Sequence, residues 1–233
     1  MFREFDNRIV AGLEGGKWVA IVLMACSHFG MTIGPEWLWP AFWIGRVCAP
    51  IFCFIIVARL FEKPLERSGR YLIRLGAWGV VSQLPYSAWT WDFGFHLNVM
   101  FTLGLGVAVI WAWARNFKPL AICLAGVTLY LGVIYDLGLI DPSFMFAGYL
   151  LYKRSPGAAI HCVSVLFAAT YFYVRPHDWI APAICMLVPS TLYISSTFSS
   201  RLTRLPGWGF YAFYPVHIGL IYVIMGPLPT FQH

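Results

Sequence analysis

A lysine and a histidine stand eleven residues apart in the segment KWVAIVLMACSHFG, which covers residues 17–30. Because an α-helix turns about 100° per residue, Lys17 and His28 fall within about 20° of the same face, separated by about 16 Å along the axis. A cation and an imidazole on one face fit a long ligand with an anionic head and a reactive tail, such as an acyl-coenzyme A. Histidine is the side chain that exchanges a proton most readily near neutral pH, so His28 could act as a general base in acyl transfer.

Two further ionisable residues are expected at a depth similar to that of His28. Arg46 lies in WIGRVCAPIFCF and His217 in GFYAFYPVHIGLIYVI, each inside an apolar run. An ionisable side chain inside a membrane is costly and therefore marks a candidate functional site. An arginine beside His28 could stabilise a developing oxyanion or bind the acceptor. We predict that His28, Arg46 and His217 line one cavity.

Lys17 and Arg74 are expected in a second layer, near the ends of their segments, where they could contact the phosphates of a coenzyme A. The cations and the histidines also have simpler interpretations. Cations at span ends often extend toward water, and a lone buried histidine often serves only packing. No serine or cysteine lies in a nucleophile motif such as GxSxG, so direct transfer in a ternary complex is the simpler mechanism. All six cysteines lie in apolar stretches without a CxxC pair, which predicts neither disulfides nor a metal site.

Membrane helices must position these residues. Of the 233 residues, 60% are hydrophobic and 11% charged, against roughly 25% charged in a soluble domain. A span takes roughly 20 apolar residues, so the chain is predicted to be an all-α, polytopic membrane protein with about nine transmembrane helices. A single transmembrane domain (17–226) would follow a cytoplasmic segment (1–16) and precede a short tail (227–233). The candidate spans are 17–34, 38–59, 71–88, 97–114, 119–136, 139–152, 158–174, 179–195 and 208–226.

The distribution of charge predicts the orientation. Basic residues flank the first span and follow the second, fourth, sixth and eighth, whereas the other loops are mainly acidic. The acidic loops hold Glu36, Asp92, Asp136, Asp141 and Asp178 beside a single Arg175. Because basic loops face the cytoplasm, nine spans put the N-terminus inside, while eight spans, without 139–152, would place Lys153 and Arg154 on the acidic side. The net charge of +6 therefore indicates topology and not nucleic-acid binding. Tryptophans at span ends, Trp89 among them, are expected to be interfacial anchors.

Several sequence blocks carry a family resemblance. KWVAIVLMACSHFG, WIGRVCAPIFCFIIVARLF, YLIRLGAWGVVSQLPYSAW and LNVMFTLGLG occur in this order, and GFYAFYPVHIGLIYVI follows near the end. Together they resemble the TraX family of integral membrane acetyltransferases, whose best-known member acetylates the N-terminus of conjugative pilin. The family is similar to wider transmembrane acyltransferases that use acetyl-CoA. That resemblance places a recurring pattern, a basic residue and a histidine separated by ten residues, on Lys17 and His28.

Two positions depart from the pattern. Lys17 stands where the wider group more often has arginine, which bears on bidentate phosphate binding. Ser27 stands where family members often carry an aspartate directly before the histidine. The sequence leaves the partner of His28 open among Asp92, Asp136 and Asp141, with Asn98 as a neutral alternative.

The sequence therefore predicts a bacterial inner-membrane acetyltransferase that takes acetyl-CoA from the cytoplasm. His28 and Arg46 would be catalytic, Lys17 and Arg74 would bind the coenzyme, and Asn98 and His217 would line the acceptor site, which is bounded by membrane lipids. The resemblance implies a pilin-like N-terminus as acceptor, and an O-acetylated cell-surface glycan or lipid is the alternative. Two other classes stay open. A transporter would be favoured by inverted repeats, of which none is visible, and a non-catalytic assembly subunit would use the buried charges to pair helices.

Overall fold

The computed structural model describes residues 2–33, 44–45, 47–61, 64–90, 97–134, 141–174, 179–202 and 207–227. Over these ranges the chain is helical and contains no β-strand, which confirms the all-α class predicted from the sequence. The helices are α1 (Phe2–Ala11), α2 (Leu13–Ile33), α4 (Cys48–Phe61), α5 (Pro64–Thr90), α6 (Val99–Ala114), α7 (Lys118–Ile134), α8 (Asp141–Tyr152), α9 (Pro156–Val174), α10 (Ile180–Cys185), α11 (Val188–Ser199) and α12 (Gly207–Met225).

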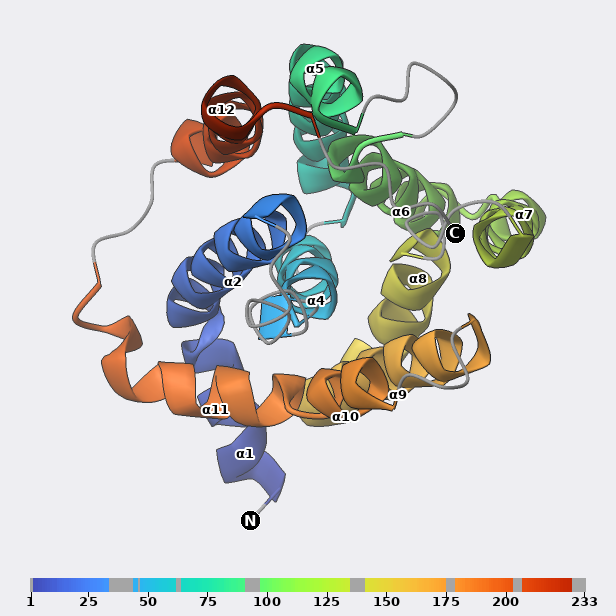
Figure 1. Cartoon of the computed structure of the whole chain (residues 1–233). Coiled ribbons are helices and arrows are strands. Elements are labelled where there is room, and N and C mark those ends of the chain that lie inside the picture. The colour runs from blue at the N-terminus through green and yellow to red at the C-terminus, as the bar shows by residue number, and fades with distance from the viewer. Residues whose placement is uncertain are drawn as a thin grey trace.

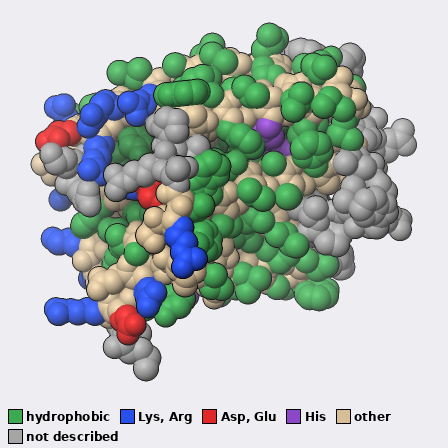
Figure 2. Space-filling view, turned by 90° about the vertical axis from the view of Figure 1, so that its left-hand side faces the viewer, with side chains coloured by type: hydrophobic (Ala, Val, Ile, Leu, Met, Phe, Trp, Pro, Cys, Tyr) green, Lys and Arg blue, Asp and Glu red, His purple; other side chains and the backbone are tan. Residues whose placement is uncertain are grey.

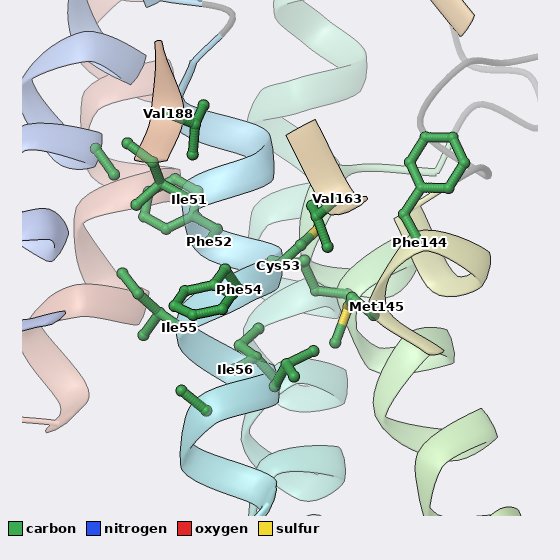
Figure 3. Close-up of a cluster of buried hydrophobic side chains, with 14 of the residues drawn as sticks. Ile51, Phe52, Cys53, Phe54, Ile55, Ile56, Phe144, Met145, Val163 and Val188 are labelled. Carbon is green, nitrogen blue, oxygen red and sulfur yellow. The ribbon is translucent and has the colours of Figure 1, made fainter. Parts of the chain in front are cut away.

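Helix α4 forms the centre of the bundle. Its sequence, CAPIFCFIIVARLF, is apolar on every face except for Arg59 in the last turn, and such a helix is stable only where other elements cover it. Helices α2, α5, α8, α9 and α11 pack against it, and Figure 1 shows α4 enclosed by a ring of helices. In Figure 3, Met145 of α8 and Val163 of α9 approach α4 on the side of Cys53. The other helices are therefore held in place by their contacts with α4 and with one another.

Each predicted span contains described helix, although residues 38–43 and 46 of the second span lie outside the described residues, and one span is divided. The segment predicted as a single span over 179–195 is split into α10 and α11 at residues 186–187. Pro189 lies in the first turn of α11, where a proline is tolerated because its missing N–H would have no partner within the helix. A proline at that place begins a helix more readily than it continues one.

The N-terminal segment, predicted only as a cytoplasmic segment over 1–16, contains a helix. Residues 2–11 form α1, which is bent by 57° from α2. The bend occurs at Gly12, where an added Cβ would lie 2.0 Å from the carbonyl oxygen of Leu192. The glycine thus allows the chain to pass directly against α11 before α2 begins.

The helices differ in their capacity to cross a membrane. Among the described residues, α9 and α12 are long and apolar enough, and the bent pair α1 and α2 adds a third candidate if it is a single span. Helices α4, α6 and α7 are apolar but shorter. The chain is a helical membrane protein, while the count of nine spans and the cytoplasmic N-terminus stay predictions.

The surface is divided by chemistry. On the face seen in Figure 2, Lys and Arg side chains gather toward one end, hydrophobic side chains cover most of the remainder, and a histidine is visible among them. Lys17, Arg59, Arg67 and Arg74 form one group of cations, and we call this group the basic end. Helix α2 runs from this end into the apolar part of the bundle, where α12 packs against both α2 and α5.

Candidate functional site

Two histidines from opposite ends of the sequence meet in the apolar part of the bundle. His28 lies on α2 and His217 on α12, and Nδ1 of His28 is 2.7 Å from Nε2 of His217. The ring planes are nearly parallel, with centroids 4.9 Å apart and an angle of 13° between the planes. At this nitrogen separation one ring donates a hydrogen bond to the other. The structure thus brings together two of the three residues predicted to line one cavity.

The second histidine is also bonded to the main chain. Nδ1 of His217 lies 2.8 Å from the carbonyl oxygen of Phe213, one turn earlier on α12. The side chain of His217 is buried, with 7% of the residue exposed. Both of its ring nitrogens make hydrogen bonds inside the protein, one to His28 and one to the Phe213 carbonyl. Its orientation is therefore fixed on two sides.

Aromatic rings surround the two imidazoles. Trp89 of α5 presents an edge-to-face contact to His28 with a centroid distance of 5.1 Å, and Phe213 stacks on His217 at 4.7 Å. Tyr214 makes edge contacts with both histidines. Because Trp89 and Tyr214 are each only 2% exposed, this aromatic wall limits the access of water to the imidazole pair.

The indole of Trp89 is tied to the backbone that carries His28. Nε1 of Trp89 donates a hydrogen bond to Oγ1 of Thr32 at 3.1 Å, and the same hydroxyl donates to the carbonyl oxygen of His28 at 2.8 Å. The expectation that Trp89 is an interfacial anchor is wrong, because its ring is buried against His28. A buried tryptophan usually has a hydrogen-bond acceptor for its N–H, and Thr32 supplies it here.

The chain just before α4 lies against the turn that carries His28. A Cβ added to Gly45 would be 2.2 Å from Cβ of Ser27 and 2.7 Å from the carbonyl oxygen of Leu23. Only glycine allows this approach. Arg46, the predicted catalytic arginine, follows directly in the sequence but lies outside the described residues.

Lys17 belongs to a charged cluster at the basic end. Its Nζ lies 2.8 and 2.9 Å from the two carboxylate oxygens of Glu14, and Arg59 of α4 makes a second ion pair with the same carboxylate. Arg67 of α5 donates to the backbone carbonyl of Arg59 at 2.6 Å. Glu14 therefore holds two cations from different helices.

Arg74 extends the same cluster. The charges of Arg59, Arg67, Arg74 and Glu14 all act on the phenol of Tyr71 in α5. The two predicted coenzyme-binding residues, Lys17 and Arg74, thus lie in the same charged region of the bundle. Arg74 itself is exposed, so an anionic ligand could reach it.

A family model described as TraX protein matches residues 13–225, which includes α2, α12 and every helix between them. The chain belongs to the TraX family. This confirms the resemblance seen in the sequence blocks, and the TraX match covers both histidines of the imidazole pair.

Two curated proteins are similar to this TraX chain. One is described as probable fimbrial assembly protein FimC, serogroup H1, of Dichelobacter nodosus, with 25% identity over 227 residues that cover 88% of this chain and 92% of the relative. The other is the uncharacterized protein RP591 of Rickettsia prowazekii (strain Madrid E), with 23% identity over 160 residues that cover 66% of this chain and 61% of that protein. No solved structure matches the chain.

The sixth predicted site residue has a different neighbourhood. Asn98 of this TraX chain is fully buried at the N-terminus of α6, where its Oδ1 accepts from the backbone N–H of Met100 at 3.0 Å. Its Nδ2 donates to the carbonyl oxygen of Gly79 at 2.8 Å and to Oε1 of Gln83 at 2.9 Å. These bonds cap α6 and attach it to α5. Substrate binding by Asn98 stays a prediction.

The predicted carboxylate partners are not part of the described site. Asp92 and Asp136 lie outside the described residues, and Asp141 begins α8, where its charge acts on Cys53 of α4. The described partner of the His28 ring is instead an imidazole. Sequence reasoning placed His217 at a similar depth but had no signal that the two rings touch, because 189 residues separate them.

Proposed function

We propose that this TraX-family protein is a membrane-embedded acetyltransferase that moves an acetyl group from acetyl-CoA to an amine or hydroxyl acceptor. The observation that carries the proposal is the arrangement along α2, a continuous helix over Leu13–Ile33 with Lys17 at the basic end and His28 in the aromatic wall. The rise of an α-helix separates them by about 16 Å along the axis. That distance suits a donor whose phosphates stay at the surface while its thioester reaches His28.

His28 would serve as the general base of a ternary complex. The acceptor nitrogen or oxygen attacks the thioester carbonyl carbon, and His28 takes the proton that the acceptor loses. The carbonyl oxygen becomes an oxyanion, which Arg46 would stabilise. When the intermediate collapses, the C–S bond breaks and the coenzyme A thiolate takes the proton back from His28. The products are the acetylated acceptor and free coenzyme A, and the histidine returns to its starting state.

The basic end would bind the anionic part of acetyl-CoA. Lys17 and Arg74 are the proposed phosphate contacts, and the Arg59 guanidinium beside them adds a group that matches phosphate oxygens in a bidentate manner. Glu14 holds Lys17 and Arg59 in the described state, so phosphates would compete with this carboxylate. We place the basic end in the cytoplasm of a bacterial inner membrane, as the positive-inside rule requires for nine spans and an internal N-terminus.

The proposed acceptor is a pilin-like N-terminus. The TraX resemblance implies this acceptor. A relative that matches this chain over 92% of the relative's length is described as a probable fimbrial assembly protein. A cell-surface glycan or lipid is the competing acceptor of the same reaction. A non-catalytic role in assembly, or transport, would give no acetyl transfer at all.

Purified protein in lipid nanodiscs tests the proposal with radiolabelled acetyl-CoA and three acceptors, namely a pilin-like peptide, a glycan and a lipid. We expect transfer to the peptide amine and a loss of about 10²–10⁴-fold in His28→Ala, the usual range for a general base. His161→Ala is the matched control, because it removes the same side chain from a different helix, α9, where the His161 ring bonds the carbonyl oxygen of Gly157. A wild-type protein that transfers acetyl to none of the acceptors would show that the proposed function is wrong.

A further inference from the structure

The hydrogen bonds around His217 have only one consistent direction when both rings are neutral. A main-chain carbonyl oxygen can only accept, so Nδ1 of His217 must carry the hydrogen that bonds to Phe213. A neutral imidazole carries a single N–H, which makes Nε2 of His217 an acceptor. Nδ1 of His28, 2.7 Å away, must then be the donor. The remaining nitrogen of His28, Nε2, carries the basic lone pair.

We infer that His217 is a positioning residue that fixes His28 in the Nδ1–H tautomer and so makes Nε2 of His28 the atom that takes the proton. The inference rests on the proposed function, in which His28 is the base. His217 was predicted from sequence only to line the acceptor site. Its place in the structure gives it a different part in the same site, one that acts through His28.

This assignment also accounts for the residue before the histidine. In many hydrolases a carboxylate orients the catalytic imidazole by accepting from the nitrogen opposite the reactive one. Here an imidazole accepts that bond, and its own direction is set by the Phe213 carbonyl. No negative charge is needed at residue 27, where Ser27 is buried against Gly45. A neutral imidazole attracts the proton of an imidazolium less strongly than a carboxylate does. Because the acceptor is neutral, the pair also avoids a buried anion in the apolar part of the bundle.

The contacts of the His28 ring restrict the direction from which the substrates arrive. The Nδ1 side of the His28 ring faces α12 through the bond to His217, and the aromatic wall contacts the ring through Trp89 and Tyr214. Nε2 lies on the other side of the ring from Cβ. A purely helix-pairing role for His217 would need only the contact between α2 and α12, whereas the positioning role needs an acceptor atom at the place of Nε2.

Substitutions of His217 separate these roles. In His217→Gln the amide oxygen stands near the place of Nε2 and can accept from His28. In His217→Asn the shorter amide can still donate to the Phe213 carbonyl but presents no acceptor to His28. We expect His217→Asn to lower kcat by at least about tenfold, because the wrong tautomer disables a catalytic histidine. The KM for acetyl-CoA should not change, and His217→Gln should recover most of kcat. Equal kcat values in His217→Asn and wild type would overturn the inference.

Nitrogen-15 NMR of histidine-labelled protein supplies a readout that does not depend on activity, with the His28 signals assigned from a His28→Gln sample. We expect the wild type to show a protonated Nδ1 and an unprotonated Nε2 on His28, and His217→Asn to shift this distribution. An Nε2–H tautomer in the wild type would overturn the inference.

If the wild type shows the expected tautomer but transfers no acetyl group, the proposed function fails and the assigned bond direction is supported. If it transfers acetyl and His217→Asn does so equally, only the inference fails.

Discussion

Ser27 and Gly45 are in direct contact, so close that a Cβ on Gly45 would lie 2.2 Å from the Cβ of Ser27. Ser27 is 5% exposed and immediately precedes His28 on α2. The contact therefore sets how the chain before α4 approaches the turn that holds the imidazole pair. A larger residue at either place would push these segments apart.

Gly45→Ala should destabilise the protein by about 1–3 kcal/mol, the usual cost of overpacking. Two of the atoms that its Cβ would meet, the Leu23 carbonyl oxygen and Cα of Ser27, belong to the backbone and cannot turn away. The measurement is thermal unfolding in detergent. Gly126→Ala is the control, because an added Cβ there meets nothing within 4 Å. Unfolding midpoints that are the same for Gly45→Ala and Gly126→Ala would contradict the close contact.

Lys17→Gln should raise the KM for acetyl-CoA by about 10- to 100-fold, because a hydrogen bond to a charged group contributes about 1.5–3 kcal/mol. If the Lys17 ammonium contacts only the phosphates, kcat should change little. Steady-state kinetics with saturating acceptor measure both constants. Lys153→Gln is the control, because it removes the same charge at an exposed place on the turn after α8. A similar rise in KM for Lys153→Gln would indicate a general electrostatic attraction in place of a specific contact.

Glu14→Gln should change the KM for acetyl-CoA in the opposite direction. The Glu14 carboxylate pairs with both Lys17 and Arg59, so its removal leaves two cations available to phosphate. We expect a several-fold lower KM, together with lower thermal stability of the ligand-free protein that added coenzyme A restores by mass action. A higher KM for Glu14→Gln would show that the carboxylate positions the cations for the coenzyme and does not compete with it.

The sequence alone predicts that Lys17 and His28 lie on one face of a helix, because this relation depends only on local helix geometry. Lys17 and His28 share a face wherever the helix is continuous, and α2 is continuous from Leu13 to Ile33. The partner of His28 depends on a contact between helices that are distant in sequence, and apolar periodicity carries no information about such a contact. The same holds for Arg59, whose pairing with Glu14 joins α4 to α2.

The sequence contains a signal for the structural role of Asn98, although this residue was predicted to line the acceptor site. An asparagine directly before an apolar helix is a typical N-cap, and Oδ1 of Asn98 bonds the Met100 N–H in that manner. The bonds from Nδ2 to Gly79 and Gln83 join α6 to α5 and again depend on tertiary structure.

Asn98→Asp should destabilise the protein although it keeps the cap. The carboxylate can still accept from Met100, but it places an acceptor against the carbonyl oxygen of Gly79 and Oε1 of Gln83. Unsatisfied buried acceptors cost about 1–3 kcal/mol each, and more when charged. Asn98→Ala loses the cap as well, at about 1 kcal/mol. Unfolding and KM for the acceptor are measured together. An unchanged stability with a raised KM would support the predicted substrate contact over the structural one.

Trp89→Ala should uncouple thioester cleavage from acetyl transfer. Trp89 is part of the aromatic wall and packs on His28, so its removal opens space through which water reaches the base and competes with the acceptor. We expect coenzyme A thiol to be released several-fold faster in the absence of acceptor. Trp89→Phe keeps an aromatic ring at the wall and should stay coupled.

Thr32→Val provides the matched control for the hydrogen bond. It preserves the shape of residue 32 but removes the hydroxyl that accepts from Nε1 of Trp89. If the bond holds the indole against His28, Thr32→Val should release thiol at a rate between those of wild type and Trp89→Ala. If Trp89→Ala releases no more thiol than wild type, the wall does not exclude water, and the residues that protect the thioester must be sought on another side of His28.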